Sequence, residues 1–491
     1  MFCQIFPFRR KGIIAAALTA LMFFAFGAVD VYAAPLDYAL ERAMERRLAI
    51  EKPDAARLSQ LTYGREPVVF PMIQLWQNER AVTISADQAI ADAELFFDLL
   101  RYVYGSYAYF GGDEVFLPIR DDVMMELARR DDLVVGMFSR MLFDALQPVV
   151  SDNHFNLDGR TFRVSYYFLA DWTRRYGRSA DGFFNMETGL YVADVIGHDK
   201  DRFFRLTADD DGNLFYAPMV HTGDVLAIYR PDIVYEDDSR DSLTLRRVAT
   251  RWHSRDEEVY LHRVDGVPVL SLSRMGFDAV PEGGAGARRF LYYAEQLRGE
   301  DVIIIDIRSN GGGNGILPVK WMYTLTGQLV PSNSIWLSTE AYHPQGIVVT
   351  GTPETNQFYI SADDIAAFFD PGGFNGFSTR RATAPRRIVE NDQLLILLVD
   401  RFSASAAEAF ADLFLNIENA LIIGQNTAGI YNTDLTFPSL SLPHSGLPFG
   451  LGRSIVVHPQ DHLPEGIGLA PDIWAMGDAL EVALALLRSK D

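Results

Sequence analysis

Two segments of the chain carry the residue types needed for nucleophilic chemistry. The first is IIIDIRSNGGGNG (303–315), a β-branched run followed by three glycines, which predicts a buried strand and a backbone-rich loop. The second is LLVDRFSASAAEAFADLF (397–414), in which an apolar run leads through small residues into helical spacing. Ser405 is therefore predicted on a strand-to-helix turn, where the amides at the helix start can stabilise an oxyanion.

Both segments also have purely structural interpretations. Ser405 and Glu408 form the Ser-x-x-Glu pattern of a capping box, in which a serine hydroxyl accepts a hydrogen bond from a backbone amide. The helix needs one cap, and Ser403 could supply it in place of Ser405. Asp306 and Arg308, at the end of the first strand, indicate a structural ion pair or a loop anchor rather than catalytic charges.

Five motifs in a fixed order give the chain a family resemblance. They are SNGGG (309–313), SASAAE (403–408), GQNTAG (424–429), LPHSG (442–446) and EGIGLAPD (465–472). In this order they resemble the catalytic domain of the carboxy-terminal-processing (tail-specific) serine peptidases, a family that includes the tricorn-core and retinoid-binding-protein branches. The resemblance implies an α/β fold of the crotonase/ClpP-like kind, with both active loops at the carboxyl ends of neighbouring parallel strands.

By this resemblance Ser405 is the nucleophile. Backbone amides at Gly311, Gly312 and Ala406 would form the oxyanion hole, because donors fixed on rigid turns need no reorganisation when charge develops. A serine hydroxyl also needs an adjacent base at neutral pH. The processing peptidases use a lysine that follows their TxG motif, but Ile430 stands there in this chain.

The base must therefore come from elsewhere. No lysine lies between Lys320 and Lys490, so a Ser–Lys dyad would require one of these two to reach the site. The tricorn-like branch uses a histidine from an upstream D-x-H motif and a glutamate from the EGxGxxPD segment, which correspond here to His154 and Glu465. A histidine with its ordinary pKa of about 6.5 suits the role.

The resemblance to the tricorn-like branch is incomplete at one position. The residue before the histidine is a relay serine in that branch, whereas this chain has Asn153, so the role of Glu465 is open. Other histidines in the catalytic region are alternative bases, namely His444, His458 and His462.

Composition and pattern divide the chain into four parts. Residues 1–33 have a basic start and a short apolar stretch, which predict a secretory signal, with an uncleaved membrane anchor as the alternative. Residues 34–150 predict a helical domain, whose aromatic residues between 102 and 110 would line a buried face or a substrate cleft. Residues 151–261 predict a β-rich segment, with a degenerate PDZ domain left open. Residues 262–491 predict the serine peptidase catalytic domain.

Charge and cysteine content exclude several classes of function. The net charge is −21, and removal of the signal with Arg9, Arg10, Lys11 and Asp30 brings it to −23, which opposes binding to nucleic acid or anionic membranes. The only cysteine, Cys3, lies in the signal, so the mature chain would have neither disulfides nor a thiolate metal site. We therefore expect a mechanism without metal or cofactor.

Together these features predict an exported, periplasmic or secreted serine peptidase that acts on protein or peptide substrates. The oligomeric state is left open. The alternative is a non-catalytic carrier or binding protein of the same fold for apolar ligands or peptides. An acyl-CoA enzyme of the crotonase type fits less well, because an exported protein would not meet a CoA substrate.

Overall fold

The computed structural model describes most of the chain. The described residues are 35–51, 79–225, 227–255, 257–275, 284–339, 369–374, 377–382, 388–433, 437–452, 454–459 and 464–489. The predicted signal (1–33), His462 and Lys490 lie outside them. Within these ranges, none of the helices has the length and apolar character needed to span a membrane.

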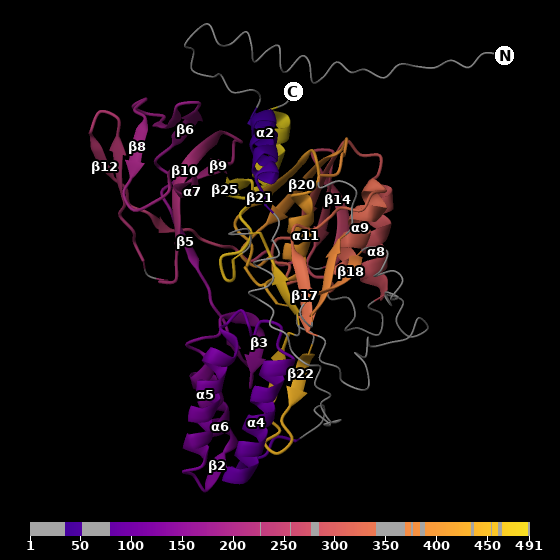
Figure 1. Ribbon diagram of the computed structural model, residues 1–491. Coiled ribbons are helices and arrows are strands. Elements are labelled where there is room, and N and C mark those ends of the chain that lie inside the picture. Colours follow the sequence, from indigo (N-terminus) through magenta and orange to yellow (C-terminus); the bar gives the residue numbers. More distant parts are fainter. Residues whose placement is uncertain are drawn as a thin grey trace, which may run out of the picture.

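A large sheet forms the centre of the molecule (Figure 1), and within the described residues it has twelve strands. Its middle is parallel, with neighbours in the order β15, β16, β20, β21, β25 and β9. The strands of this parallel part are β15 (Val267–Leu272), β16 (Val302–Asp306), β20 (Leu394–Val399), β21 (Ala420–Gly424), β25 (Ile473–Ala475) and β9 (Phe204–Ala208). β14 (Val259–Val264) forms an antiparallel hairpin with β15 at one edge.

Helices bury both faces of the parallel part. Because side chains alternate along a strand, Ile303 and Ile305 of β16 belong to the core under one set of helices, whereas Ile304 belongs to the core under the other. The first set is α8 (Gly284–Gln296), α9 (Ile316–Thr326) and α11 (Ala406–Phe414), and the second is α2 (Pro35–Leu48) and α12 (Ala479–Arg488). Burial on both faces explains why the segment Leu394–Val399 is apolar throughout.

Three helices form a separate layer at the end of the molecule opposite α2 (Figure 1). They are α4 (Ala86–Tyr102), α5 (Gly112–Leu127) and α6 (Val135–Leu146), together with the short pair β1 (Thr83–Ser85) and β2 (Asp132–Val134). Their buried residues share one core with a four-stranded sheet, in the order β22 (Phe437–Ser441), β23 (Pro448–Leu451), β3 (Asp152–Leu157) and β4 (Arg160–Phe162). Residues far apart in sequence thus build one unit.

A buried carboxylate ties the helices to this sheet. Asp92 of α4 accepts hydrogen bonds from the backbone amides of His444 and Ser445, at 3.0 and 2.7 Å, in the turn between β22 and β23.

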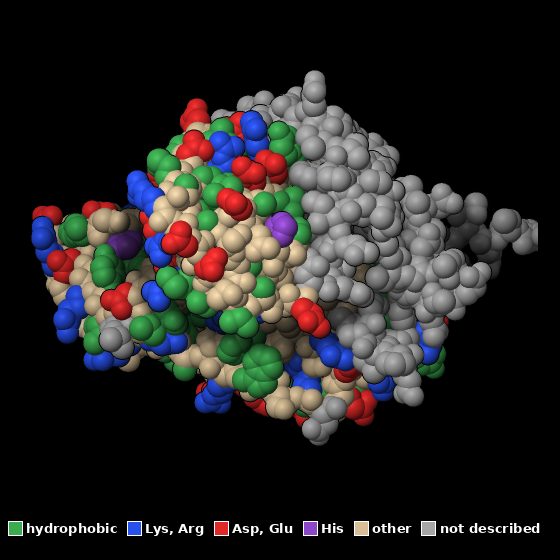
Figure 2. All heavy atoms as spheres, turned by 90° about the horizontal axis from the view of Figure 1, so that it is seen from below, with side chains coloured by type: hydrophobic (Ala, Val, Ile, Leu, Met, Phe, Trp, Pro, Cys, Tyr) green, Lys and Arg blue, Asp and Glu red, His purple; other side chains and the backbone are tan. Residues whose placement is uncertain are grey.

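Figure 2 shows the surface at this end of the molecule, where acidic and basic side chains are interspersed. The helix α2 lies outside this unit, because its buried residues share a core with β21 and α12.

The middle of the chain consists mainly of short strands. One group extends the central sheet by antiparallel pairing from β9 through β10 to β5 and β13. A small sheet has the order β12, β11, β8, and another joins β17 and β24 to the β18–β19 hairpin. The remaining elements are β5 (Tyr167–Ala170), β6 (Tyr176–Ser179), β7 (Gly182–Asn185), β8 (Val192–Val195), α7 (Lys200–Phe203), β10 (Leu214–Thr222), β11 (Asp232–Tyr235), β12 (Arg240–Ser242), β13 (Arg246–Arg247), β17 (Ile335–Thr339), β18 (Phe369–Phe374), β19 (Phe377–Ala382) and β24 (Ser454–Val457).

Candidate active site

The two loops singled out in the sequence meet at the carboxyl ends of neighbouring parallel strands, as predicted. β16 pairs in parallel with β20, with Asp306 opposite Leu398, and each strand leads into one of the loops. The loops touch directly, since Ala404 N–H donates to the Asn310 carbonyl at 2.9 Å. Gly312 has a φ of +96°, and a Cβ there would lie 2.6 Å from Ala404 O and 2.8 Å from Ser405 Cβ. Only glycine allows this approach.

Ser405 occupies the predicted strand-to-helix turn immediately before α11. Its φ of 55° and ψ of −115° are rare for a residue with a side chain, and such strain is typical of a serine held on a sharp turn. The predicted capping box is present, with Glu408 N–H donating to the Ser405 carbonyl at 2.8 Å and the Ser405 amide donating to the Glu408 carboxylate at 3.0 Å. Ser405 Oγ also lies 3.2 Å from His154 Nε2.

Ser403 has a different environment and is not the helix cap. It is fully buried, and its hydroxyl donates to the Ile307 carbonyl at 2.9 Å while accepting from Asp400 N–H at 3.1 Å. The helix begins at Ala406, two residues too late for Ser403 to cap it. The alternative that Ser403 supplies the cap is therefore wrong, and its hydroxyl joins the ends of β16 and β20.

His154 reaches the serine from the upstream strand β3. This strand pairs with β23, so the D-x-H motif and the region after Ser405 belong to one sheet. The other ring nitrogen, Nδ1, lies 3.4 Å from Thr433 Oγ1, and that hydroxyl donates to Asp152 Oδ1 at 2.8 Å. Serine, imidazole, hydroxyl and carboxylate thus form one chain of contacts.

The described alternative bases have other surroundings. His444 is exposed in the turn between β22 and β23, and its backbone amide is bonded to Asp92. His458 is buried, with Nδ1 at 2.6 Å from Ser334 Oγ and Nε2 at 3.2 Å from the Tyr431 carbonyl. Within the described ranges, His154 is the histidine whose ring lies within hydrogen-bonding distance of Ser405.

Glu465 forms hydrogen bonds with Asn153, the residue before His154. Its Oε1 accepts from the Asn153 backbone amide at 3.0 Å and from Asn153 Nδ2 at 2.7 Å. Burial of the carboxyl, together with the nearby negative charge of Asp152, raises the pKa of Glu465 well above its ordinary value, although the two Asn153 donors act in the opposite direction. Low dielectric and a neighbouring carboxylate both favour its neutral form.

Glu408 fastens the serine turn to the TAG loop. Its carboxylate accepts from four groups, namely Ser405 N at 3.0 Å, Thr427 Oγ1 at 2.6 Å, Gly429 N at 2.8 Å and Ile430 N at 2.7 Å. Burial raises its pKa, and these hydrogen bonds oppose the rise. The predicted hydrogen bond between the Glu408 carboxylate and the amide at the start of the helix is present. The same carboxylate also accepts hydrogen bonds from the TAG loop.

The backbone amides around Ser405 differ in whether they already donate a hydrogen bond within the protein. Gly312 N–H donates to Asn310 Oδ1 at 2.9 Å, so this amide already has an acceptor. Ala406 N–H stands at the first position of α11, where an amide has no partner within its own helix. No acceptor among the described residues is found for the amides of Ala406 and Gly311.

Residues 270–475 match the model of peptidase family S41. The chain contains a peptidase domain of this family. The S41 domain spans β15 to β25, including both loops and Ser405. The protein is accordingly a serine-type peptidase, a hydrolase whose substrates are proteins or peptides.

Comparison with other proteins adds little beyond the family. No curated protein matches the chain. Among solved structures, mature CPAF is 15% identical with a TM-score of 0.42, and the match covers 82% of this chain and 96% of CPAF. The photosystem II D1 C-terminal processing protease is 14% identical with a TM-score of 0.38, covering 82% and 97%. The tricorn protease is 11% identical with a TM-score of 0.33, covering 83% and 37%. These values are too low to support an argument about substrate.

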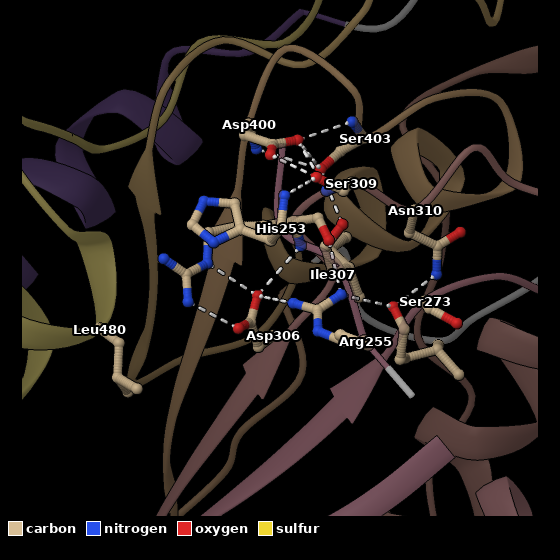
Figure 3. Close-up of polar contacts among 12 residues, drawn as sticks. His253, Arg255, Ser273, Asp306, Ile307, Ser309, Asn310, Asp400, Ser403 and Leu480 are labelled. Carbon is tan, nitrogen blue, oxygen red and sulfur yellow. Dashed lines mark hydrogen bonds and ion pairs between the residues drawn. The ribbon is translucent and has the colours of Figure 1, made fainter. Parts of the chain in front are cut away.

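A polar network at the ends of β16 and β20 fixes the loops of the S41 domain (Figure 3). The predicted ion pair of Asp306 and Arg308 is present at 2.7 Å, and both residues are buried. Arg255 joins them through Asp306 and through the Arg308 carbonyl. Asp400, at the end of β20, accepts from the amide of Ser309 at 2.9 Å, which ties the glycine loop to the serine turn.

Arg401 holds the EGxG segment of the S41 domain against the same turn. Its guanidinium donates to the carbonyls of Thr427, Ile467 and Gly466. Burial lowers the pKa of Arg401 to about 10. A positive group thus fixes the backbone that carries Glu465.

Three residues at the site were not singled out as functional in the sequence. Asp152 is the aspartate of the D-x-H motif, so its position was a signal that could have been used. Tyr104, assigned to a predicted aromatic face, donates its hydroxyl to Asp152 Oδ2 at 2.6 Å. Thr433 lies in a stretch without pattern, and nothing in the sequence distinguishes it from other threonines.

Proposed function

We propose that the protein is an exported peptidase that cleaves peptide bonds with Ser405 as nucleophile and His154 as general base. The observation that carries the proposal is the 3.2 Å contact between Ser405 Oγ and His154 Nε2. A serine and a base within hydrogen-bonding distance, on a strained turn at a helix start, have the geometry required for acyl transfer.

The reaction would proceed in two balanced halves. As Ser405 Oγ forms a bond to the substrate carbonyl carbon, its proton passes to His154 Nε2, and the same proton then goes to the leaving amine when the C–N bond breaks. A water molecule next gives one proton to Nε2 as its oxygen bonds to the acyl carbon. The C–Oγ ester bond then breaks, the imidazolium returns a proton to Ser405 Oγ, and the new carboxylic acid leaves. No redox partner or cofactor is needed.

Backbone amides would stabilise the developing oxyanion. Ala406 N–H and Gly311 N–H are the donors we assign, since Gly312 N–H is already bonded to Asn310. Gly312 contributes by its lack of a side chain, which leaves room for the two loops to meet. We also propose a crotonase/ClpP-like arrangement for residues 262–491, and export by the basic and apolar segment 1–33.

In this proposal Glu465 positions the strand that carries the base. Through Asn153 it fixes β3 next to His154, without touching the imidazole itself. Replacement of Glu465 should therefore disturb turnover less than replacement of His154.

An active-site-directed fluorophosphonate probe tests the function. The full mature chain is incubated with the probe, digested, and analysed by mass spectrometry, in parallel with Ser405→Ala and His154→Ala. Labelling at Ser405 that is lost in Ser405→Ala and slowed in His154→Ala, together with hydrolysis of an unstructured protein such as casein, supports the proposal. Absence of labelling combined with saturable binding of an apolar dye would overturn it in favour of a carrier.

A further inference from the structure

Asp152 is a buried carboxylate that is linked to His154 through the hydroxyl of Thr433. It begins β3 and is 1% exposed. Tyr104 OH donates to Oδ2 at 2.6 Å, and Oδ1 accepts from Thr433 Oγ1 at 2.8 Å. The amides of His154 and Phe155 also donate to Oδ1, at 2.8 and 3.2 Å. Four donors converge on this one carboxylate, as a buried anion requires.

The hydroxyl of Thr433 links that carboxylate to the imidazole. A threonine hydroxyl has one hydrogen and two lone pairs. The 2.8 Å contact to Asp152 uses the hydrogen, so the 3.4 Å contact to His154 Nδ1 leaves the hydroxyl oxygen as acceptor of an Nδ1–H. A proton held on Nδ1 leaves Nε2 unprotonated, and Nε2 is the atom that faces Ser405 Oγ. The arrangement selects the tautomer that a general base needs.

Glu465 does not form an equivalent chain of hydrogen bonds to the imidazole of His154. It is bonded to the amide and side-chain nitrogens of Asn153, and the other side-chain atom of Asn153, Oδ1, is buried without a hydrogen-bond partner among the described residues. The link from Glu465 therefore ends at Asn153. A carboxyl that is buried beside a second carboxylate also tends to hold its proton, as the raised pKa of Glu465 indicates.

We propose that Asp152, acting through the hydroxyl of Thr433, is the carboxylate that orients His154 and stabilises its imidazolium form, with Tyr104 holding the far oxygen of Asp152. This assignment rests on the proposed serine mechanism. Asp152 and Thr433 are positioning residues, because neither contacts the substrate. The transferred proton stays on Nε2 until the leaving amine takes it.

Several charged and titratable groups among the described residues lie near His154. Asp152 faces it through Thr433, and Tyr104 and Glu465 lie beyond Asp152. Glu408 accepts from the Ser405 amide, and its negative charge favours the charged form of Arg401. Removal of the negative charge at Asp152 destabilises the imidazolium, so the pKa of His154 should fall and the rise of kcat/KM with pH should shift to lower pH.

The test compares threonine and aspartate variants of the full mature chain. Thr433→Val removes the hydroxyl at constant shape and should lower kcat by about tenfold or more at nearly unchanged KM, and Thr433→Ser should restore it. Thr207→Val is the matched control, because Thr207 is also fully buried but bonds to the Arg205 carbonyl in β9. Asp152→Asn should shift the midpoint of the pH profile down by about one unit. Glu465→Gln should shift it less.

A second readout separates this proposal from the serine mechanism itself. Histidine NMR titrations of Ser405→Ala and of Ser405→Ala with Asp152→Asn report the pKa of His154 without any turnover, with His154→Ala to assign the signal. A lower pKa in the double variant supports the Asp152 assignment even if the chain proves not to be a peptidase. An unchanged His154 pKa, or wild-type kcat in Thr433→Val, overturns it. If Asp152→Asn does not fold, the Thr433→Val and Thr433→Ser pair decides.

Discussion

His154 and Ser405 are 251 positions apart in sequence, yet Nε2 of one lies 3.2 Å from Oγ of the other. The contact exists because β3, which carries the histidine, pairs with β23, and because the core of that sheet is shared with helices α4 to α6. The proposed catalytic pair is thus brought together by packing between the helical layer and the S41 domain. Loosening of that packing would separate the base from the nucleophile without altering either loop.

The two serines of the SAS motif should respond in opposite ways to removal of their hydroxyls. Ser405→Ala should abolish turnover while lowering the free energy of unfolding by no more than about 0.5–2 kcal/mol, the range expected for one lost helix cap. Ser403→Ala should cost about 1–3 kcal/mol, since it removes the hydroxyl that accepts from the Asp400 amide and one of two hydrogen bonds to the Ile307 carbonyl. Denaturant unfolding and peptide hydrolysis, measured on both variants, check this. Full activity in Ser405→Ala would remove Ser405 from the mechanism.

The pH dependence of turnover should follow the histidine. A histidine base acts in its neutral form, so kcat/KM should rise with pH through an apparent pKa of about 6–7 and then level off. His154→Ala should lower kcat/KM by several orders of magnitude, as in other serine–histidine sites. The measurement is a pH series of initial rates with one peptide substrate. Near-native rates in His154→Ala would direct attention to His444, His458 and His462.

The sequence was a good guide to the strands and loops of the S41 domain. It was a poor guide to the contacts that join this domain to β3. Strands such as β16 and β20 are apolar throughout because helices cover both faces, so they could be found from composition, and the loops after them follow from the glycines and small residues. His154 could be proposed as the base because the motif that contains it is local in sequence. Thr433 could not be found, because its role depends on where the chain after the TAG motif folds back against β3, and no local pattern encodes that contact.

The helix α2 illustrates a related limit. Its apolar spacing correctly predicts a helix, but periodicity does not say which surface the helix covers. Arg47 is buried in α2 and donates to the Ala420 carbonyl at 2.5 Å and to Asp472 at 3.2 Å, contacts that connect α2 to the S41 domain. Such partners lie hundreds of residues away in sequence.

Chelators and thiol reagents should leave the activity unchanged. Removal of the predicted signal, which contains Cys3, would leave a chain without cysteine, and the proposed steps use only a serine, a histidine and backbone amides. Rates measured before and after treatment with iodoacetamide and with EDTA provide the check. Inactivation by EDTA that is reversed by a divalent cation would contradict the proposed mechanism.

Glu408→Gln should weaken the serine turn. The wild-type carboxylate accepts from four donors, whereas a glutamine amide presents two hydrogens of its own to the same groups. Loss of acceptors for buried N–H groups costs about 1–3 kcal/mol, and the turn that fixes Ser405 should become less ordered. We expect lower thermal stability together with slower fluorophosphonate labelling. Unchanged labelling at reduced stability would restrict Glu408 to a folding role.

Glu465→Gln should make the protein less sensitive to rising pH. The folded state raises the pKa of Glu465 well above the value of about 4.3 expected in the unfolded chain, so the folded state binds the proton more tightly. The stabilisation from that proton is complete below the unfolded pKa and is lost as pH rises through the folded one. Glutamine keeps an acceptor for Asn153 but carries no proton to lose. The melting temperature of Glu465→Gln relative to wild type should therefore be higher at pH 8 than at pH 5, whereas the exposed control Glu187→Gln should show no such trend. An equal difference at both pH values would mean that Glu465 is charged in the folded protein, and that it, and not only Asp152, supplies negative charge behind His154.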